Sequence, residues 1–194
     1  MKLHIIATVF DRTLPIRRLI YDFLCQSNPN WMLHIVQDGN KIKDTALFVE
    51  TLQDPRISFK ATKNIGGHFG FPNRDMMLRE IEADDSDFVL HTNDDNQYMP
   101  TFIDSFLRNC TCETGFIYCD TIHSYMNYGI LLTEIKVGYI DMGSFIVRYD
   151  VAKKIGFSSR DMVADGIYAQ ECAMECSKRG LKIYMIRRPL FIHN

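Results

Sequence analysis

Four short apolar runs alternate with helical patterns in the first half of the chain, and this alternation restricts the fold more than any other feature. The runs are rich in β-branched and aromatic residues, as is typical of strands in a largely buried parallel sheet. They span residues 3–10, 31–36, 56–60 and 88–93. Helical segments begin near Pro15, at Asp44 and after Pro72. This order predicts an α/β fold, with a Rossmann-like, mostly parallel sheet flanked by helices.

The second half of the chain has a less regular pattern. It predicts helices at residues 99–110, 151–155 and 165–179, strands at 115–119, 138–148 and 181–186, and an irregular segment at 120–137. The sequence contains no internal repeats and no linker. A chain of 194 residues is therefore predicted to form one domain with a full core.

Composition and charge exclude several classes of protein. The net charge of −2 gives no reason to expect nucleic acid or an anionic membrane as a partner. No apolar run approaches the roughly 18 residues that span a bilayer, and the N-terminus does not resemble a secretory signal. The 6 cysteines do not follow the paired spacing of zinc sites, so we expect them to be reduced. These features predict a cytoplasmic protein without a transmembrane segment.

The strand at residues 88–93 stops abruptly at two adjacent carboxylates, Asp94 and Asp95. Open α/β folds place their ligands at the carboxyl ends of their strands. Two carboxylates beside an amide provide hard oxygen donors, which suit Mg²⁺ or Mn²⁺ and leave positions for a phosphate. The alternative is a simple turn, because Asp and Asn are common turn residues.

Five motifs, in the expected order, resemble those of family 2-type glycosyltransferases with the GT-A fold. They are IATVFDR at residues 6–12, PNW followed by IVQDGN at 29–40, NIG at 64–66, NR at 73–74 and NDDNQYMP at 93–100. The similarity extends over nearly the whole chain. It implies a single GT-A domain at residues 1–194, with a nucleotide-sugar donor half at 1–100 and an acceptor half at 101–194.

The resemblance also implies an activity. The expected enzyme is an inverting, divalent-metal-dependent glycosyltransferase that moves a sugar from a UDP-sugar, or a dTDP-sugar, to a hydroxyl of a glycan or glycoconjugate. The Q-x-x-R-W motif of processive synthases does not occur. Acceptor binding is expected at residues 121–137, where aromatic side chains suit sugar stacking.

The donor nucleotide is expected at the ends of the first two strands. By the resemblance, Thr8, Phe10 and Asp11 would contact the base. The Asp38 carboxylate can accept the N3–H of uracil or thymine, which cytosine and adenine lack. Its alternative role is that of a turn residue beside Gly39.

Two further residues complete the expected nucleotide site. Arg74 would contact the diphosphate or the base, although an arginine near a helix start can simply be solvated. Asp94 would accept hydrogen bonds from the ribose hydroxyls.

The metal would be held by Asp95, together with His193 just beyond the last predicted strand. Many GT-A enzymes place an additional metal ligand at this position, and imidazole suits Mn²⁺ better than Mg²⁺. A histidine near a chain end is otherwise usually a surface residue. Because the sequence stops at Asn194, it is consistent with the catalytic portion of a longer protein, whose other regions could associate with a membrane.

An inverting transferase also needs a base for the acceptor hydroxyl. Asp165 resembles the family's catalytic aspartate, but Ala164 stands where the family usually has an acid. The alternative role of Asp165 is a helix N-cap. Asp161 and Asp141 are the other candidates for the base.

Two other functions remain open from the sequence. A sugar-nucleotide nucleotidyltransferase shares the sheet, but it usually has a glycine-rich basic loop where this chain has residues 11–15. A non-catalytic nucleotide- or carbohydrate-binding module would explain Ala164. Gln37 and Asn93 also depart from the family pattern, where aspartates are usual.

Overall fold

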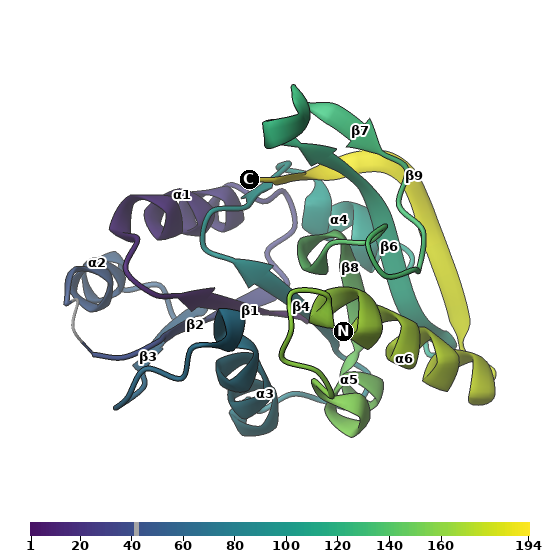
Figure 1. The fold of residues 1–194 in the computed structure, drawn as a ribbon, viewed down its shortest axis with the longest axis horizontal. Helices are drawn as coiled ribbons and strands as arrows, with labels where there is room; N and C mark the ends of the chain where they lie inside the picture. The colour runs from purple at the N-terminus through teal and green to yellow at the C-terminus, as the bar shows by residue number, and fades with distance from the viewer. Residues whose placement is uncertain (41–42) are drawn as a thin grey trace.

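The computed structural model describes residues 1–40 and 43–194. Within these residues, nine strands form one curled sheet with helices on both faces (Figure 1). The strands are β1 (Leu3–Val9), β2 (Trp31–Gln37), β3 (Ile57–Ala61), β4 (Phe88–Asn93), β5 (Gln97–Tyr98), β6 (Thr114–His123), β7 (Gly129–Leu131), β8 (Phe145–Arg148) and β9 (Lys182–His193).

The α-helices are α1 (Thr13–Leu24), α2 (Asp44–Leu52), α3 (Phe71–Glu80), α4 (Phe102–Leu107), α5 (Tyr149–Ile155) and α6 (Ala164–Lys178). Short 3₁₀ turns are η1 (His68–Gly70), η2 (Ser124–Met126) and η3 (Met142–Ser144). In the described part of the chain, no helix is long and apolar enough to cross a membrane.

The sheet has the strand order β3-β2-β1-β4-β8-β6-β9-β5, and β7 pairs with β6. The first four strands are parallel, β6 and β9 are also parallel, and the remaining pairs are antiparallel. Most paired residues lie in the parallel ladders, so the predicted mostly parallel α/β sheet is confirmed. In register, Thr8 lies opposite Val36 and Asn93, which brings the carboxyl ends of β1, β2 and β4 to one edge.

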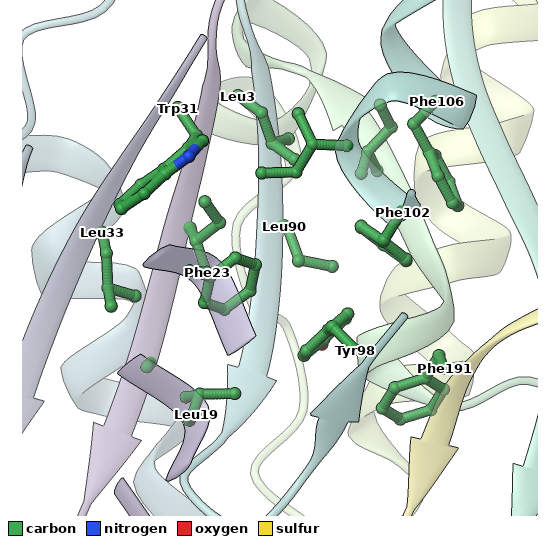
Figure 2. Packing of buried hydrophobic residues seen from close by; sticks show 14 of the residues in the cluster. Leu3, Leu19, Phe23, Trp31, Leu33, Leu90, Tyr98, Phe102, Phe106 and Phe191 are labelled. Carbon is green, nitrogen blue, oxygen red and sulfur yellow. The ribbon is translucent and has the colours of Figure 1, made fainter. Parts of the chain in front are cut away.

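The helices form two layers because the strands alternate their side chains between the two faces. Apolar residues of α1, α2 and α4 pack on one face, and those of α3, α5 and α6 pack on the other. Figure 2 shows the first of these cores, in which Phe23 of α1 lies near Trp31 of β2, while Tyr98 and Phe191 face each other from β5 and β9. This core therefore contains residues of both β1 and β9, the first and the last strand in the sequence.

The helix predicted at residues 99–110 is shorter and is preceded by a strand. Residues 97–98 form β5, and the Met99 N–H donates to the Leu190 carbonyl at 3.0 Å. Pairing with β9, which is distant in sequence, therefore determines the backbone here, and α4 begins only at Phe102.

The strand predicted at residues 138–148 is largely wrong, because only Phe145–Arg148 is extended. The Ser144 N–H and hydroxyl both bond to the Asp141 carbonyl, at 2.9 and 2.6 Å, and this closes the η3 turn. A Cβ at Gly143 would lie 2.4 Å from the Phe191 ring, so the turn packs directly on β9.

Two strands are longer than predicted. β6 continues to His123, into the segment expected to be irregular, and β9 continues to His193 instead of ending at residue 186. They pair with each other along this extension, with register shifts around Asp120. Because the two strands pair with each other, their backbone N–H and C=O groups are hydrogen-bonded in the extension. Both segments are therefore strands, although the local sequence pattern does not indicate one.

Candidate active site

Two adjoining pockets lie at the carboxyl ends of β1, β2, β4 and β9. The β1–β2 pocket has a volume of about 380 Å³, and its lining includes Thr8, Phe10, Arg12, Asp38, Gly67 and Asp94. The β9 pocket has a volume of about 250 Å³, and its lining includes Arg74, Asn96, Met142, Asp141, Asp165 and His193. Phe69 and Asn93 line both pockets, so the two form one continuous site region.

Asp38, at the end of β2, fixes the glycine-rich loop that begins at Asn64. Its Oδ1 accepts from the Gly66 N–H at 2.7 Å and from the Asn73 amide at 3.0 Å, and its Oδ2 accepts from the Gly67 N–H at 3.0 Å. Burial opposes ionisation, but these hydrogen bonds outweigh it and lower the pKa of Asp38. The side chain is therefore an ionised carboxylate facing the pocket.

Arg74 of α3 is 1% exposed and joins the loop to β4. Its guanidinium donates to the Phe69 carbonyl at 2.6 Å and to the Asn93 side chain at 2.5 Å. Burial lowers its pKa to about 10, so it stays charged. The solvated arginine considered as an alternative is thereby wrong, and the cation lies at the boundary of the two pockets.

The acidic turn after β4 is bridged by an arginine from the other side of the cleft. Arg12 donates to Oδ1 of Asp94 and, at 2.6 Å, to Oδ2 of Asp95. The Arg12 side chain is 49% exposed, whereas that of Asp94 is 2% exposed. A half-exposed cation therefore pairs with two carboxylates, one of which is buried.

Asp94 has an unusual environment for an acid. Burial raises its pKa to about 6, and Arg12 offsets this only in part. Its Oδ2 is buried and has no hydrogen-bond partner in the described residues. A buried acceptor without a hydrogen bond is costly to the fold, so this oxygen carries a desolvation penalty that its surroundings do not compensate.

Asp165 is the second residue of α6, whose N-cap is Val163, so the N-cap role considered for Asp165 is wrong. Its Oδ1 accepts from the Gly166 N–H at 2.7 Å, and the carboxyl lines the β9 pocket. Burial, reinforced by the Asp141 charge, raises the pKa of Asp165. A carboxylate whose pKa is shifted upward can accept a proton more readily at neutral pH.

Asp141 lies between two histidines in the same pocket. Its Oδ2 is 2.6 Å from Nε2 of His123, and its Oδ1 is 2.9 Å from Nδ1 of His193. Among the described residues, these three form the group whose nitrogen and oxygen atoms could gather around a metal ion. Burial opposes ionisation of Asp141, but the contacts with His193 and His123 lower its pKa.

The remaining residues singled out from the sequence divide into two groups. Thr8 and Phe10 line the β1–β2 pocket as expected. Asp11 and Asp161 are exposed and line neither pocket. Asp95 contacts Arg12, and its carbonyl accepts from the Asn194 amide at 2.6 Å, which brings the end of β9 beside the acidic turn.

Sequence reasoning missed two members of the site. Arg12 stands within the first motif, directly after a strand, and a cation at that position could have been matched with the acidic turn. His123 gave no such signal, because its segment was expected to be irregular. Its place follows from the pairing of β6 with β9, in which His123 lies opposite His193.

The fold is similar to solved glycosyltransferase structures. S. aureus TarS 1–349 in complex with UDP-GlcNAc matches with a TM-score of 0.79 at 12% identity, over 100% of this chain and 58% of that chain. The complex of TarS 1–349 with UDP gives a TM-score of 0.77 at 12% identity, over 100% of this chain and 60% of that chain.

The mannosyltransferase PcManGT from Pyrobaculum calidifontis, in complex with GDP-Man and Mn²⁺, gives a TM-score of 0.74 at 11% identity, over 99% of this chain and 56% of that chain. This protein thus spans less than two thirds of each of these relatives. No protein-family model matches the sequence, and no curated protein matches it. The structural similarity confirms the GT-A fold that the motifs implied.

Proposed function

We propose that this protein is a glycosyltransferase that moves a sugar from a UDP-sugar to an acceptor hydroxyl with inversion, using a divalent metal ion. One observation carries the proposal. The acidic turn of β4, the half-buried acid Asp165 and His193 meet around two continuous pockets at the carboxyl edge of the sheet. The fold is shared with proteins that were solved with UDP, UDP-GlcNAc and GDP-Man.

The β1–β2 pocket is suited to the nucleotide. Oδ1 of Asp38 already accepts two hydrogen bonds, whereas Oδ2 accepts one. Because a carboxylate oxygen has two lone pairs, Oδ2 can accept one further bond, and the N3–H of uracil is a matching donor. Thymine offers the same donor, so a dTDP-sugar is the second candidate. Asp94 would accept from the ribose hydroxyls with its unsatisfied Oδ2.

The residues present also suit a divalent ion. Asp95 offers a hard oxygen ligand, and His193 offers an imidazole that favours Mn²⁺ over Mg²⁺. When bound, the ion would neutralise the charge that accumulates on the departing diphosphate. Arg12 engages Oδ2 of Asp95, so the ion would use Oδ1 or displace Arg12 from Oδ2.

Asp165 is the proposed base. It lines the β9 pocket beside Arg74 and Asn93, and its raised pKa suits removal of a proton from the acceptor hydroxyl. Asp141 is less suited to this role because both of its carboxylate oxygens contact histidines.

The acceptor is proposed to bind through residues 101–194, and the donor through residues 1–100. Tyr125, Tyr128 and Tyr139 are exposed in the segment after β6 and around β7. Exposed aromatic rings suit the apolar faces of sugar rings, so a glycan or glycoconjugate is the proposed acceptor class.

Calorimetric titration of UDP, with dTDP and GDP as controls, tests the nucleotide site. We expect uridine-selective binding that is stronger with Mn²⁺ and loses this metal dependence in Asp95→Ala. The surface variant Asp85→Ala is the matched control and should bind as the wild type does. Equal binding of GDP and UDP, or an unchanged metal dependence in Asp95→Ala, would contradict the proposal.

Chemistry is tested separately with Asp165→Asn. UDP-sugars are first screened with the wild type to find one that is hydrolysed or transferred. With that donor, Asp165→Asn should bind UDP normally but lose about 10²–10⁴-fold in turnover. UDP binding without transfer or hydrolysis in the wild type would instead favour the non-catalytic binding module.

A further inference from the structure

A chain of polar side chains leads from the surface of the acceptor half to His193. The Tyr125 hydroxyl is 3.1 Å from Nδ1 of His123, and Nε2 of His123 is 2.6 Å from Oδ2 of Asp141. The other oxygen of Asp141 is 2.9 Å from Nδ1 of His193. We call these residues, Tyr125, His123, Asp141 and His193, the β9 relay.

The fold places the relay beside the acidic turn. His123 and His193 are register partners at the carboxyl ends of the parallel strands β6 and β9, which lie side by side in Figure 1. Their rings are 5.4 Å apart. Asp141 reaches both rings from the residue before η3. Beyond His193, Asn194 bonds to the Asp95 carbonyl.

The distances distinguish hydrogen bonding from direct binding of one ion by all three groups. Two ligands at about 2.1 Å from one ion stand roughly 3 Å or more apart. Nε2 of His123 and Oδ2 of Asp141 are closer, at 2.6 Å, which is a hydrogen-bond distance. Both nitrogens of His123 therefore have partners already, so His123 is not a free ligand.

His193 has a different arrangement. Nδ1 faces Asp141, although the oxygen lies off the axis of the ring N–H and a small rotation of the ring is needed to align them. No described residue makes a hydrogen bond with Nε2. A histidine that binds a metal usually donates its other ring N–H to a carboxylate, which fixes its tautomer and orientation.

We propose that Asp141 is a positioning residue, held by His123 and Tyr125, that keeps the proton of His193 on Nδ1 and so leaves Nε2 as a metal ligand beside Asp95. The proposal rests on the metal-dependent function proposed above. It adds His123, which the sequence did not single out, and gives each residue a role: Asp141 orients His193, and His123 with Tyr125 orients Asp141.

The first test needs no metal. Nitrogen NMR of isotope-labelled histidines, at about pH 9 where imidazole is neutral, reports which ring nitrogen carries the proton. In the wild type His193 should carry it on Nδ1, and in Asp141→Leu this preference should be lost. His193→Gln assigns the signal. A proton on Nε2 in the wild type, or an unchanged tautomer in Asp141→Leu, would contradict the positioning role of Asp141. This result would not depend on whether the proposed transferase function is correct.

The second test uses Mn²⁺ alone and then Mn²⁺ with UDP. Asp141→Leu should weaken Mn²⁺ binding by about 10–100-fold, the usual effect of removing a residue that orients a metal ligand. Spin-echo spectra of bound Mn²⁺ should show coupling to an imidazole nitrogen that disappears in His193→Gln. Asp85→Leu, a matched change of an exposed acid, should bind as the wild type does.

The outcomes separate the two proposals. Normal Mn²⁺ affinity and nitrogen coupling in Asp141→Leu would overturn the positioning role and leave the transferase proposal standing. Loss of Mn²⁺ binding in His123→Phe together with unaffected binding in Asp95→Ala would show direct binding by His123, and would also overturn it. If the wild type binds no Mn²⁺ while His193 keeps its proton on Nδ1, the metal-dependent function fails and the ligand role of His193 fails with it.

Discussion

Asp94 is a buried acid that is paired with Arg12. The Asp94 side chain is 2% exposed, yet one of its oxygens has no hydrogen-bond partner among residues 1–40 and 43–194, and the other accepts from a half-exposed arginine. Asp95 shares the same arginine. The guanidinium supplies a positive charge where a metal ion is proposed, so arginine and metal compete for the same carboxylates.

Replacing Arg12 should therefore favour the metal. In Arg12→Met, Mn²⁺ affinity without nucleotide should rise several-fold, because one contact with a charged group contributes about 1.5–3 kcal/mol and exposure reduces this value. Paramagnetic resonance of free Mn²⁺ measures the change. Arg108→Met, at an exposed arginine that pairs only with Asp104, is the control. Weaker Mn²⁺ binding in Arg12→Met would contradict competition.

The raised pKa of Asp94 should also make the free energy of unfolding depend on pH. Because burial raises its pKa to about 6, the folded protein binds this proton more tightly than the unfolded chain does. This contribution to stability is therefore present at low pH and is lost as the pH rises from about 4 to 6. Replacement of Asp94 by asparagine keeps the shape of the protonated acid and removes the buried negative charge.

We thus expect Asp94→Asn to raise the free energy of unfolding near neutral pH by roughly 1–3 kcal/mol, since one pKa unit corresponds to about 1.4 kcal/mol. The gain should vanish below about pH 4.5, where Asp94 itself is protonated in the folded state. Chemical denaturation at both pH values measures it. An equal gain at both would show that the buried charge is not its cause.

At the scale of elements, the glycine-rich loop and η1 link β2 to α3. Asp38 accepts hydrogen bonds from two loop N–H groups, and Arg74 holds the following turn through the Phe69 carbonyl. Gly70, with φ +77°, lies against Thr8 of β1. The loop is therefore fixed at three points, and it forms a wall of the β1–β2 pocket.

Two glycines of this loop give an informative pair of variants. A Cβ at Gly70 would lie 2.9 Å from the Thr8 hydroxyl and 3.0 Å from Nη1 of Arg74, whereas one at Gly67 would meet nothing within 4 Å. Gly70 has αL dihedrals, which cost alanine about 1–2 kcal/mol, whereas Gly67, at φ 64° and ψ −143°, lies in a region that costs alanine about 1–3 kcal/mol. Gly70→Ala should lose roughly 1–3 kcal/mol beyond its backbone strain through overpacking, and UDP affinity should fall with it. A loss of no more than about 2 kcal/mol in Gly70→Ala, with unchanged UDP affinity, would show that the contact with Thr8 and Arg74 is loose.

At the scale of the whole molecule, the site joins the two halves of the sheet. The β1–β2 pocket belongs to the parallel strands of the first half, and the β9 pocket adds Asp141, Asp165 and His193 from the second. A ligand that spans both pockets would therefore stabilise the native state as a unit.

Thermal unfolding tests this view. UDP at about 100 times its Kd stabilises the native state by about 2.7 kcal/mol, which corresponds to a rise in Tm of roughly 5–11 °C for a chain of this size. We expect Mn²⁺ to enlarge the shift in the wild type and to have no such effect in Asp95→Ala. Hydrogen exchange should show protection of both β2 and the end of β9. Protection confined to the first half would contradict a ligand shared between the halves.

The sequence by itself determined the parallel half of the fold and the acids that belong to it. Strands β1 and β4 are almost wholly buried and β2 is buried over most of its length, and polar residues stand at the ends of β2 and β4. Local pattern alone therefore predicts these strands and the places where the chain returns to solvent. Asp38, Asp94 and Asp95 follow directly from those ends. The motifs added the GT-A fold, which the structural similarity confirms.

The second half was decided by tertiary contacts. β5, the end of β6 and the end of β9 are strands because they pair with each other across long sequence separations, and no local periodicity indicates them. For the same reason the sequence singled out His193, and Asp141 only as a candidate base, but did not single out His123. Only the parallel pairing of β6 with β9 brings His123 beside it, and only the η3 turn, packed on Phe191, brings Asp141 between the two rings.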